Sequence, residues 1–113
     1  MQRRTKQFAL RVISLTNALP NTPTARVIGN QLLRSATSVG ANYRAACRAK
    51  SDADFIYKLS IVEEEADESL YWLELLLEAQ IVKEPLLTPL LQEANELVAI
   101  IVATIKTLKQ NKK

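Results

Sequence analysis

The sequence predicts an all-α fold, an antiparallel up-down-up-down four-helix bundle formed as a single domain by residues 1–113. Two Gly and four Pro in 113 residues, with abundant Ala, Leu, Glu, Lys and Gln, favour helix. No segment shows the alternation of apolar and polar residues that a half-buried strand requires. Three short connections separate the periodic segments, so consecutive helices must run antiparallel. The expected helices span residues 3–19, 23–49, 52–81 and 87–110.

The first two helices are delimited by a loop with clear end signals. Pro20 ends the first helix, Thr22 can cap the second, and Pro23 suits its first position, where a missing N–H costs nothing. Apolar residues recur three and four positions apart along the first helix, at Phe8, Val12, Leu15 and Leu19. The inward face of the second helix consists mostly of small residues: Ala25, Ile28, Leu32, Ala36, Val39, Tyr43 and Ala46.

The last two helices follow the same logic. Ser51 and Asp54 form a capping-box-like pair, in which the hydroxyl accepts from the third N–H and the carboxylate reaches back. The core stripe of the third helix is Phe55, Leu59, Val62, Ala66, Leu73 and Leu76. Pro85 and Pro89 are expected to precede the regular part of the fourth helix, whose apolar positions are Leu87, Leu90, Leu91, Ala94, Leu97, Val98, Ile101, Ile105 and Leu108.

The second half of the third helix carries more apolar surface than one core stripe needs. Residues 70–77 read LYWLELLL, in which only Glu74 is charged. Because one protomer covers only one side of such a helix, a second surface remains for another subunit. We expect Tyr71 and Trp72 to anchor that contact, since large aromatics with a polar handle dominate subunit interfaces, with ordinary core packing as the alternative. Leu75 belongs to the same expected interface.

Charge is sorted along the chain. Residues 1–50 contain nine Arg or Lys and no acid, whereas all twelve acids lie between Asp52 and Glu96, with only two lysines among them. Helix-dipole complementarity explains the residues at the turn itself, where basic side chains end one helix and acids begin the next. The wider sorting suggests that oppositely charged helices match each other, within a bundle or between subunits.

A polar line on the second helix has two interpretations. Gln31, Arg34, Ser35, Ser38 and Asn42 follow each other at spacings of one, three and four, with Arg44 nearby. The simpler interpretation is a solvated helix back. The alternative is a shared surface on which the guanidinium groups of Arg34 and Arg44 bind carboxylates or phosphates.

The acidic segment VEEEADES of the third helix, residues 62–69, points in several directions and does not form a convergent site. Most of its acids are expected to be solvated or salt-bridged. Glu64 and Asp67 flank the core stripe, so we expect these two to face the basic second helix, within the protomer or between subunits. Cys47 lies at the end of the second helix and is expected to be structural filler, although cationic neighbours could make it reactive.

Several functional classes find no support in the sequence. The chain has no His, which removes the commonest general acid/base and the commonest transition-metal ligand. It also lacks a glycine-rich phosphate loop and a cysteine cluster, so we expect no enzyme, no metal and no cofactor. The longest apolar run is far shorter than the roughly 20 residues that span a bilayer. A single Cys and no signal peptide indicate a cytoplasmic protein without a membrane partner.

The text from Gln31 to Leu76 resembles a known family. RSATSVGANYRAA on the second helix and DFIYKLSIVEEEADESLYWLELL on the third are similar to the family of the protein encoded by intervening sequences in bacterial 23S rRNA genes. The matching positions are Arg34, Ser35, Ser38, Asn42, Tyr43 and Arg44, then Asp54, Phe55, Lys58, Leu59, Glu64 and Trp72. The resemblance implies an antiparallel four-helix protomer that assembles into a homo-oligomer, a ring of five, without established catalysis.

Two hypotheses for function follow. The first is a non-enzymatic homo-oligomeric scaffold or interaction protein, whose interface comprises Arg34, Ser38, Asn42, Arg44, Glu64, Tyr71, Trp72 and Leu75. The alternative is an RNA- or DNA-binding protein, as in a related branch, the accessory protein of diversity-generating retroelements. Its phosphate contacts would be Arg3, Arg4, Lys6, Arg11, Arg26, Arg44 and Arg48. A net charge of only +3 and an acidic third helix weigh against that alternative, and another protein partner stays open.

Overall fold

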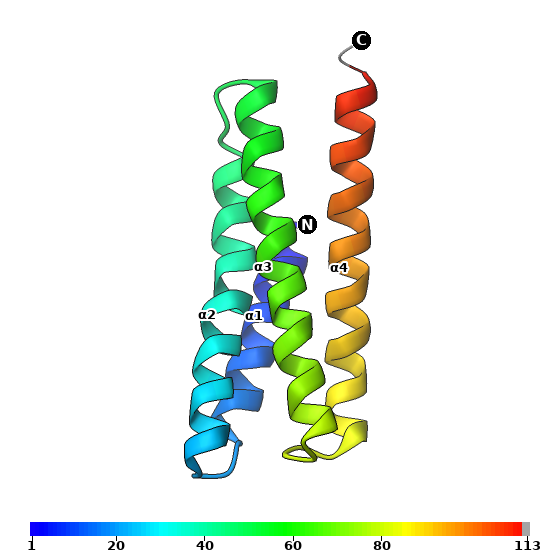
Figure 1. The fold of residues 1–113 in the computed structure, drawn as a ribbon. Coiled ribbons are helices and arrows are strands. Elements are labelled where there is room, and N and C mark those ends of the chain that lie inside the picture. Colours follow the sequence, from blue (N-terminus) through cyan, green and yellow to red (C-terminus); the bar gives the residue numbers. More distant parts are fainter. Residues whose placement is uncertain (112–113) are drawn as a thin grey trace.

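The computed structural model describes residues 1–111 and contains four helices: α1 (Gln2–Asn17), α2 (Pro23–Ala46), α3 (Asp52–Glu78) and α4 (Glu84–Gln110). Consecutive helices run antiparallel and pack in chain order, which confirms the predicted four-helix bundle (Figure 1). The molecule measures 50 × 21 × 19 Å. In Figure 1, the α1–α2 and α3–α4 connections share the lower end, and the α2–α3 turn lies at the upper end.

The first two helices begin as predicted and end slightly earlier. Thr22 Oγ1 accepts from the Ala25 N–H at 3.2 Å, and proline occupies the first turn of α2, which confirms this cap. The helix ends at Ala46, three residues before the predicted end. Its chain continues as a tight turn, in which the Ala49 N–H donates to the Ala46 carbonyl at 3.0 Å. α1 ends at Asn17, and the Ala18 N–H closes its last turn by donating to the Leu15 carbonyl at 3.0 Å. Leu19, directly before Pro20, is biased away from helical geometry.

The cap of α3 differs in one detail from the predicted capping box. Ser51 Oγ accepts from the Asp54 N–H at 3.1 Å, as predicted. The Asp54 carboxylate instead accepts from the Lys50 N–H at 3.2 Å and from Lys58 Nζ at 3.1 Å. These donors, Lys58 first and then the Lys50 backbone, lower the pKa of Asp54. The predicted reach back to Ser51 is therefore displaced by one residue.

α3 ends at Glu78, three residues earlier than predicted, because the chain reverses at Gln80. This residue has a left-handed backbone with φ of 57°, and its N–H donates to the Leu77 carbonyl at 3.0 Å. The Ile81 N–H donates to the Leu76 carbonyl at 3.0 Å. Together these bonds form a Schellman motif, in which glycine is the usual residue at the position of Gln80.

The predicted start of α4 at residue 87 is wrong. The helix begins at Glu84, so Pro85 lies in its first turn and Pro89 lies inside it. Pro85 is tolerated because an N–H there would have no intrahelical partner. Pro89 leaves the Pro85 carbonyl without an intrahelical donor, a loss confined to the second turn. Packing of the apolar stripe that starts at Leu87 outweighs this local cost.

The core has two parts. The lower core takes residues from all four helices: Phe8, Val12, Ile28, Leu32, Ala36, Leu73, Leu76, Leu87, Leu90, Ala94 and Leu97. The upper core takes them from α2, α3 and α4 only: Val39, Ala46, Leu59, Val62, Ala66, Ile101 and Ile105. The 16 residues of α1 reach only part of the way along the 27 residues of α4. The upper end of the molecule is therefore a three-helix structure (Figure 1).

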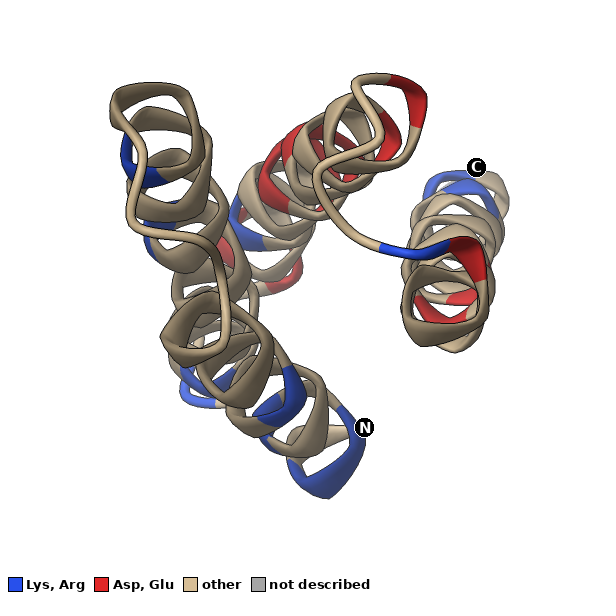
Figure 2. Cartoon of the chain, turned by 90° about the horizontal axis from the view of Figure 1, so that it is seen from below, with Lys and Arg blue, Asp and Glu red and all other residues tan. Residues whose placement is uncertain are grey.

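The helix seams differ in character. α2 and α3 share the most extensive packing, whereas α1 and α4 touch over a short stretch. Seen along the bundle, basic positions gather on α1 and α2, and acidic positions on α3 and the first part of α4 (Figure 2). α4 is the one described helix long and apolar enough to cross a bilayer. Its buried stripe, Leu87, Leu90, Ala94, Leu97, Ile101 and Ile105, accounts for part of that composition, because 28% of its most apolar 18-residue window is buried.

Candidate interaction surfaces

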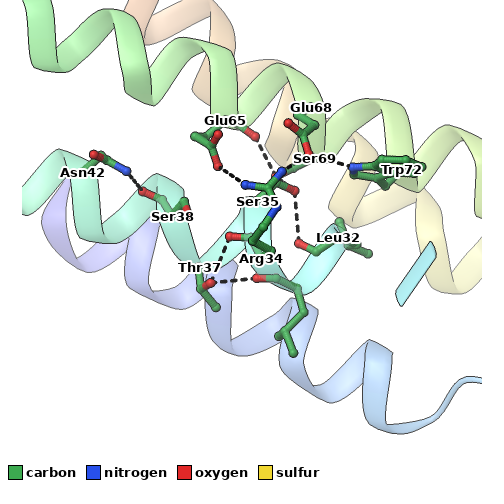
Figure 3. A network of polar contacts seen from close by, with 11 residues as sticks. Leu32, Arg34, Ser35, Thr37, Ser38, Asn42, Glu65, Glu68, Ser69 and Trp72 are labelled. Carbon is green, nitrogen blue, oxygen red and sulfur yellow. Dashed lines mark hydrogen bonds and ion pairs between the residues drawn. The ribbon is translucent and has the colours of Figure 1, made fainter. Parts of the chain in front are cut away.

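A polar network links α2 and α3 on the outer side of their seam. Arg34 donates to Glu65 Oε2 at 3.3 Å and to Glu68, and Trp72 Nε1 donates to Glu68 Oε2 at 3.1 Å (Figure 3). The indole bond first, and then the Arg34 guanidinium, lower the pKa of Glu68. Arg34 and Trp72, two predicted interface residues, are thus held in place by the same carboxylate. Arg34 is exposed and Trp72 is half-buried.

The acids that pair with α2 inside the protomer are not the predicted ones. Glu64 and Asp67 are exposed and make no ion pair with any described residue, whereas Glu65 and Glu68 bind Arg34. One residue rotates a helical position by about 100°, so Glu65, four residues before the buried Ser69, points toward α2, whereas Glu64 points away. Glu68 lies at the edge of that face, where it still reaches Arg34. The prediction of an intramolecular contact for Glu64 and Asp67 was therefore wrong. A contact between subunits stays a prediction.

The polar line on α2 divides into buried and exposed members. Ser35 is fully buried, and its Oγ accepts from Ser69 Oγ at 3.0 Å. It therefore belongs to the α2–α3 packing, not to a solvated or shared surface. Ser38 is half-buried, and its carbonyl accepts from Asn42 Nδ2 at 2.8 Å (Figure 3). The sequence does contain one indication of this buried pair, because Ser69 stands between Ala66 and Leu73 on the core stripe of α3.

A partly exposed stripe runs along α3, and its member Glu68 borders the polar network with α2. Its members follow one another at spacings of four and three residues, and we call them the α3 stripe: Tyr57, Ile61, Glu64, Glu68, Tyr71 and Leu75. Tyr57 is 65% exposed and Tyr71 is 52% exposed, while Leu75 is half-buried. Tyr71 packs edge-on against Trp72, with ring centroids 5.1 Å apart and planes at 70°. The predicted interface residues Glu64, Tyr71, Trp72 and Leu75 thus lie together.

A basic groove of about 670 Å³ lies between the first part of α1 and the second half of α2. Its cationic residues are Arg3, Lys6, Arg44 and Arg48, and none of the described acidic side chains lines it. The sequence alone could not bring these two pairs together, because they are about forty residues apart. The groove therefore unites four of the seven predicted phosphate contacts, and Arg44 belongs to it rather than to the α3 stripe.

The other three predicted phosphate contacts lie elsewhere. Arg4 turns toward α4 and donates twice to the Glu93 carboxylate, each time at 2.7 Å. These bonds lower the pKa of Glu93, and the nearby charge of Arg11 adds to the effect. Arg26 donates to Asn21 Oδ1 at 2.7 Å, near the lower end of the bundle.

Cys47 is exposed, so its interpretation as structural filler was wrong. The buried stripe of α2 ends at Ala46, and Cys47 is the residue that follows the helix. The neighbouring Tyr43 remains partly packed against the upper core. Burial first, and then the thiol of Cys47, raise the pKa of Tyr43. Within the described residues, no cluster of acidic or sulfur side chains could hold a metal ion.

Comparisons with known proteins give the family. A search of curated proteins found no match. A crystal structure of a protein of unknown function from the S23 ribosomal protein family, from Bacteroides thetaiotaomicron VPI-5482, is 37% identical to this chain, with a TM-score of 0.87. The alignment covers 93% of this chain and 97% of that one. The family model of the 23S rRNA-intervening sequence protein matches residues 1–103, so the chain belongs to this family.

Proposed function

We propose that this protein is a non-enzymatic, cytoplasmic scaffold that assembles into a homo-oligomer through the α3 stripe. The observation that carries the proposal is that the partly exposed α3 stripe has the four-three spacing of a helix interface. Apolar side chains stand at both of its ends, and carboxylates stand between them. The absence of His from the sequence supports a role without acid/base catalysis.

The energetics favour association at this stripe. Burying an exposed large apolar side chain contributes about 1.5–3 kcal/mol. Tyr57, Tyr71 and the partly exposed Ile61 and Leu75 could therefore offset much of the cost of association. Trp72 is already positioned by Glu68, so little side-chain entropy would be lost when a partner packs beside it.

The oligomeric mass tests this proposal. Size-exclusion chromatography with multi-angle light scattering at micromolar concentration should give a multiple of the 12.7 kDa chain mass, about fivefold for a ring of five. Trp72 is the only tryptophan, so its fluorescence should change when the sample is diluted through the dissociation range. A mass of one chain at every concentration, with no change in fluorescence, would rule out the scaffold.

A second candidate function, polyanion binding, rests on the basic groove. Four cations with no described acid beside them form a surface suited to phosphate groups, and repetition of the groove around an oligomer would multiply avidity. Neutralising about four phosphates per groove predicts a slope of roughly −3 to −4 for log affinity against log salt.

A binding assay with a structured RNA should separate groove cations from other cations. The charge reversal Arg44→Glu with Arg48→Glu should abolish retention, whereas Arg26→Glu, outside the groove, should leave it nearly unchanged. Few aromatics are available for base stacking, so the retained RNA should show little sequence preference. Equal loss of RNA in both variants would mean that net charge, and not the groove, determines binding.

A further inference from the structure

We infer that the α3 stripe of one copy docks on the outer face of α1 of the next copy, in a head-to-tail contact. The inference rests on the proposed oligomer and names its second surface. The outer face of α1, called here the α1 stripe, consists of Arg3, Lys6, Leu10 and Ile13. Leu10 is 49% exposed and Ile13 is 36% exposed, although both are large apolar residues.

The α3 stripe is poorly suited to pair with itself. Two carboxylates stand at its centre: Glu68 is paired with Arg34 inside the protomer, whereas Glu64 is exposed and makes no ion pair with any described residue. In a two-fold contact each copy presents the same patch, so the unpaired Glu64 would face the carboxylates of the partner's central segment. Opposed like charges destabilise such a contact. A different surface with positive charge is a better counterpart.

The two stripes lie at the same height along the bundle. A side chain at Gly40 would come within 3.5 Å of the Thr5 backbone, so these two residues are level. Ser35 is level with Ser69 through their 3.0 Å hydrogen bond. Because α2 runs antiparallel to α1 and to α3, five residues from Ser35 to Gly40 correspond to five residues from Ser69 back to Glu64. Thr5 is therefore level with Glu64.

Equal height matters because a closed ring relates its copies by rotation without translation along the axis. If that axis runs along the bundle, each residue meets a partner at nearly its own level. The α1 stripe then pairs with positions about two or three residues further along α3, a displacement of roughly 3–5 Å. Leu10 and Ile13 reach Tyr71 and Leu75 in this register.

Charge complementarity fits the same register. Arg3 and Lys6 make no ion pair with any described residue, and Glu64 and Asp67 are likewise exposed without an ion pair. The cations of the α1 stripe would face these carboxylates. A single docking mode thus unites the apolar parts of both stripes and pairs their free charges. Arg44 and Arg48 of the basic groove stay available to a polyanion.

A mixing experiment tests the pairing. Leu10→Asp should disable the α1 stripe, and Tyr71→Asp the α3 stripe, so that each variant alone has the 12.7 kDa mass of a monomer by light scattering. An equimolar mixture should form a complex of one copy of each, because each variant keeps the stripe that the other lacks. Val102→Asp on α4, also at an exposed apolar residue, is the matched control and should assemble as the wild type does. Circular dichroism checks that all variants remain helical.

A charge exchange gives an independent test. Lys6→Glu and Asp67→Lys should each weaken assembly, and the chain that carries both changes should regain most of it. Oligomers of Leu10→Asp, or a mixture that stays monomeric, would overturn the pairing while leaving the proposed scaffold intact. A loss of RNA retention in Lys6→Glu without a loss of assembly would assign this cation to a polyanion instead, and would also overturn the pairing. A monomeric wild type would instead remove the proposed function itself.

Discussion

Removal of the Arg4 guanidinium should destabilise the seam between α1 and α4 more than its position near the surface suggests. Arg4 donates to both oxygens of Glu93 at 2.7 Å and approaches Glu96 at 3.4 Å. The Glu93 side chain is only 15% exposed, whereas that of Arg4 is 36% exposed. In Arg4→Met, the carboxylate of Glu93 would therefore stay mostly buried without its donor.

The expected magnitude follows from opposing terms. Two unit charges about 4 Å apart attract each other by roughly 4 kcal/mol at an effective dielectric constant of about 20. Fixing a long arginine side chain costs up to about 2 kcal/mol, and partial desolvation of the two charges opposes the attraction further, which leaves a net contribution of about 1–2 kcal/mol. Because Arg4→Met also leaves a buried acceptor unpaired, its cost should be higher, about 2–3 kcal/mol. Glu93→Gln should cost only about 1 kcal/mol, since a neutral amide oxygen still accepts a bond.

Urea unfolding, followed by circular dichroism at one fixed protein concentration, measures these costs. A double-mutant cycle with Arg4→Met and Glu93→Gln should give a coupling free energy of about 1–2 kcal/mol. Arg48→Met, at an exposed arginine without an ion pair among the described residues, should change stability by less than about 0.5 kcal/mol. A cost for Arg4→Met no larger than that of Arg48→Met would refute the reasoning.

Four further changes have defined expected outcomes. The pKa of Glu93 is lowered, so this carboxylate stabilises the fold fully above its ordinary pKa of about 4.3, and the stabilisation is lost as the pH falls through the lowered value. The difference in free energy of unfolding between wild type and Arg4→Met, measured in urea, should therefore shrink below about pH 4. Gly40→Ala adds a methyl group at an ordinary 3.5 Å contact and should raise the free energy of unfolding by about 0.5–1 kcal/mol in urea titration; a loss would mean that α1 cannot accommodate it. Gln80→Gly relieves the strain of the left-handed backbone and should raise the free energy of unfolding by up to about 1 kcal/mol. An unchanged urea midpoint would contradict this. Ser51→Ala removes the cap of α3 and should cost about 1 kcal/mol in the same assay, whereas a neutral result would show that Asp54 suffices.

Local signals determined most of what the sequence could predict. The caps at Thr22 and Ser51 depend on residues within the same turn, so their geometry follows from the amino-acid sequence alone. The end of α3 was misplaced because Gln80 adopts a backbone conformation that usually requires glycine, and nothing in its side chain announces this. The start of α4 was placed three residues too late, since the tertiary packing that keeps Pro85 and Pro89 in a helix cannot be seen locally.

The candidate surfaces depended more on contacts between helices. The apolar excess around Tyr71 and Trp72 correctly indicated a partly uncovered face of α3. To predict that Glu65 and not Glu64 pairs with α2, one must know how α3 is rotated about its axis relative to α2. The buried Ser69 shows this rotation. A serine is small enough for a helix seam, but its polarity does not mark it as a core residue. The basic groove was unpredictable in detail, because it depends on the level at which α1 begins beside α2.

The two-part core also implies that the ends of the molecule differ in local stability. The upper core lacks a contribution from α1, so its amides are protected by three helices instead of four. Hydrogen exchange near Ala46, Leu59 and Ile105 should therefore proceed through partial openings of lower free energy than exchange near Leu32 and Leu73. The turn between α2 and α3 would then loosen before the rest of the bundle unfolds. The part of the bundle that α1 covers would unfold last, as one cooperative unit.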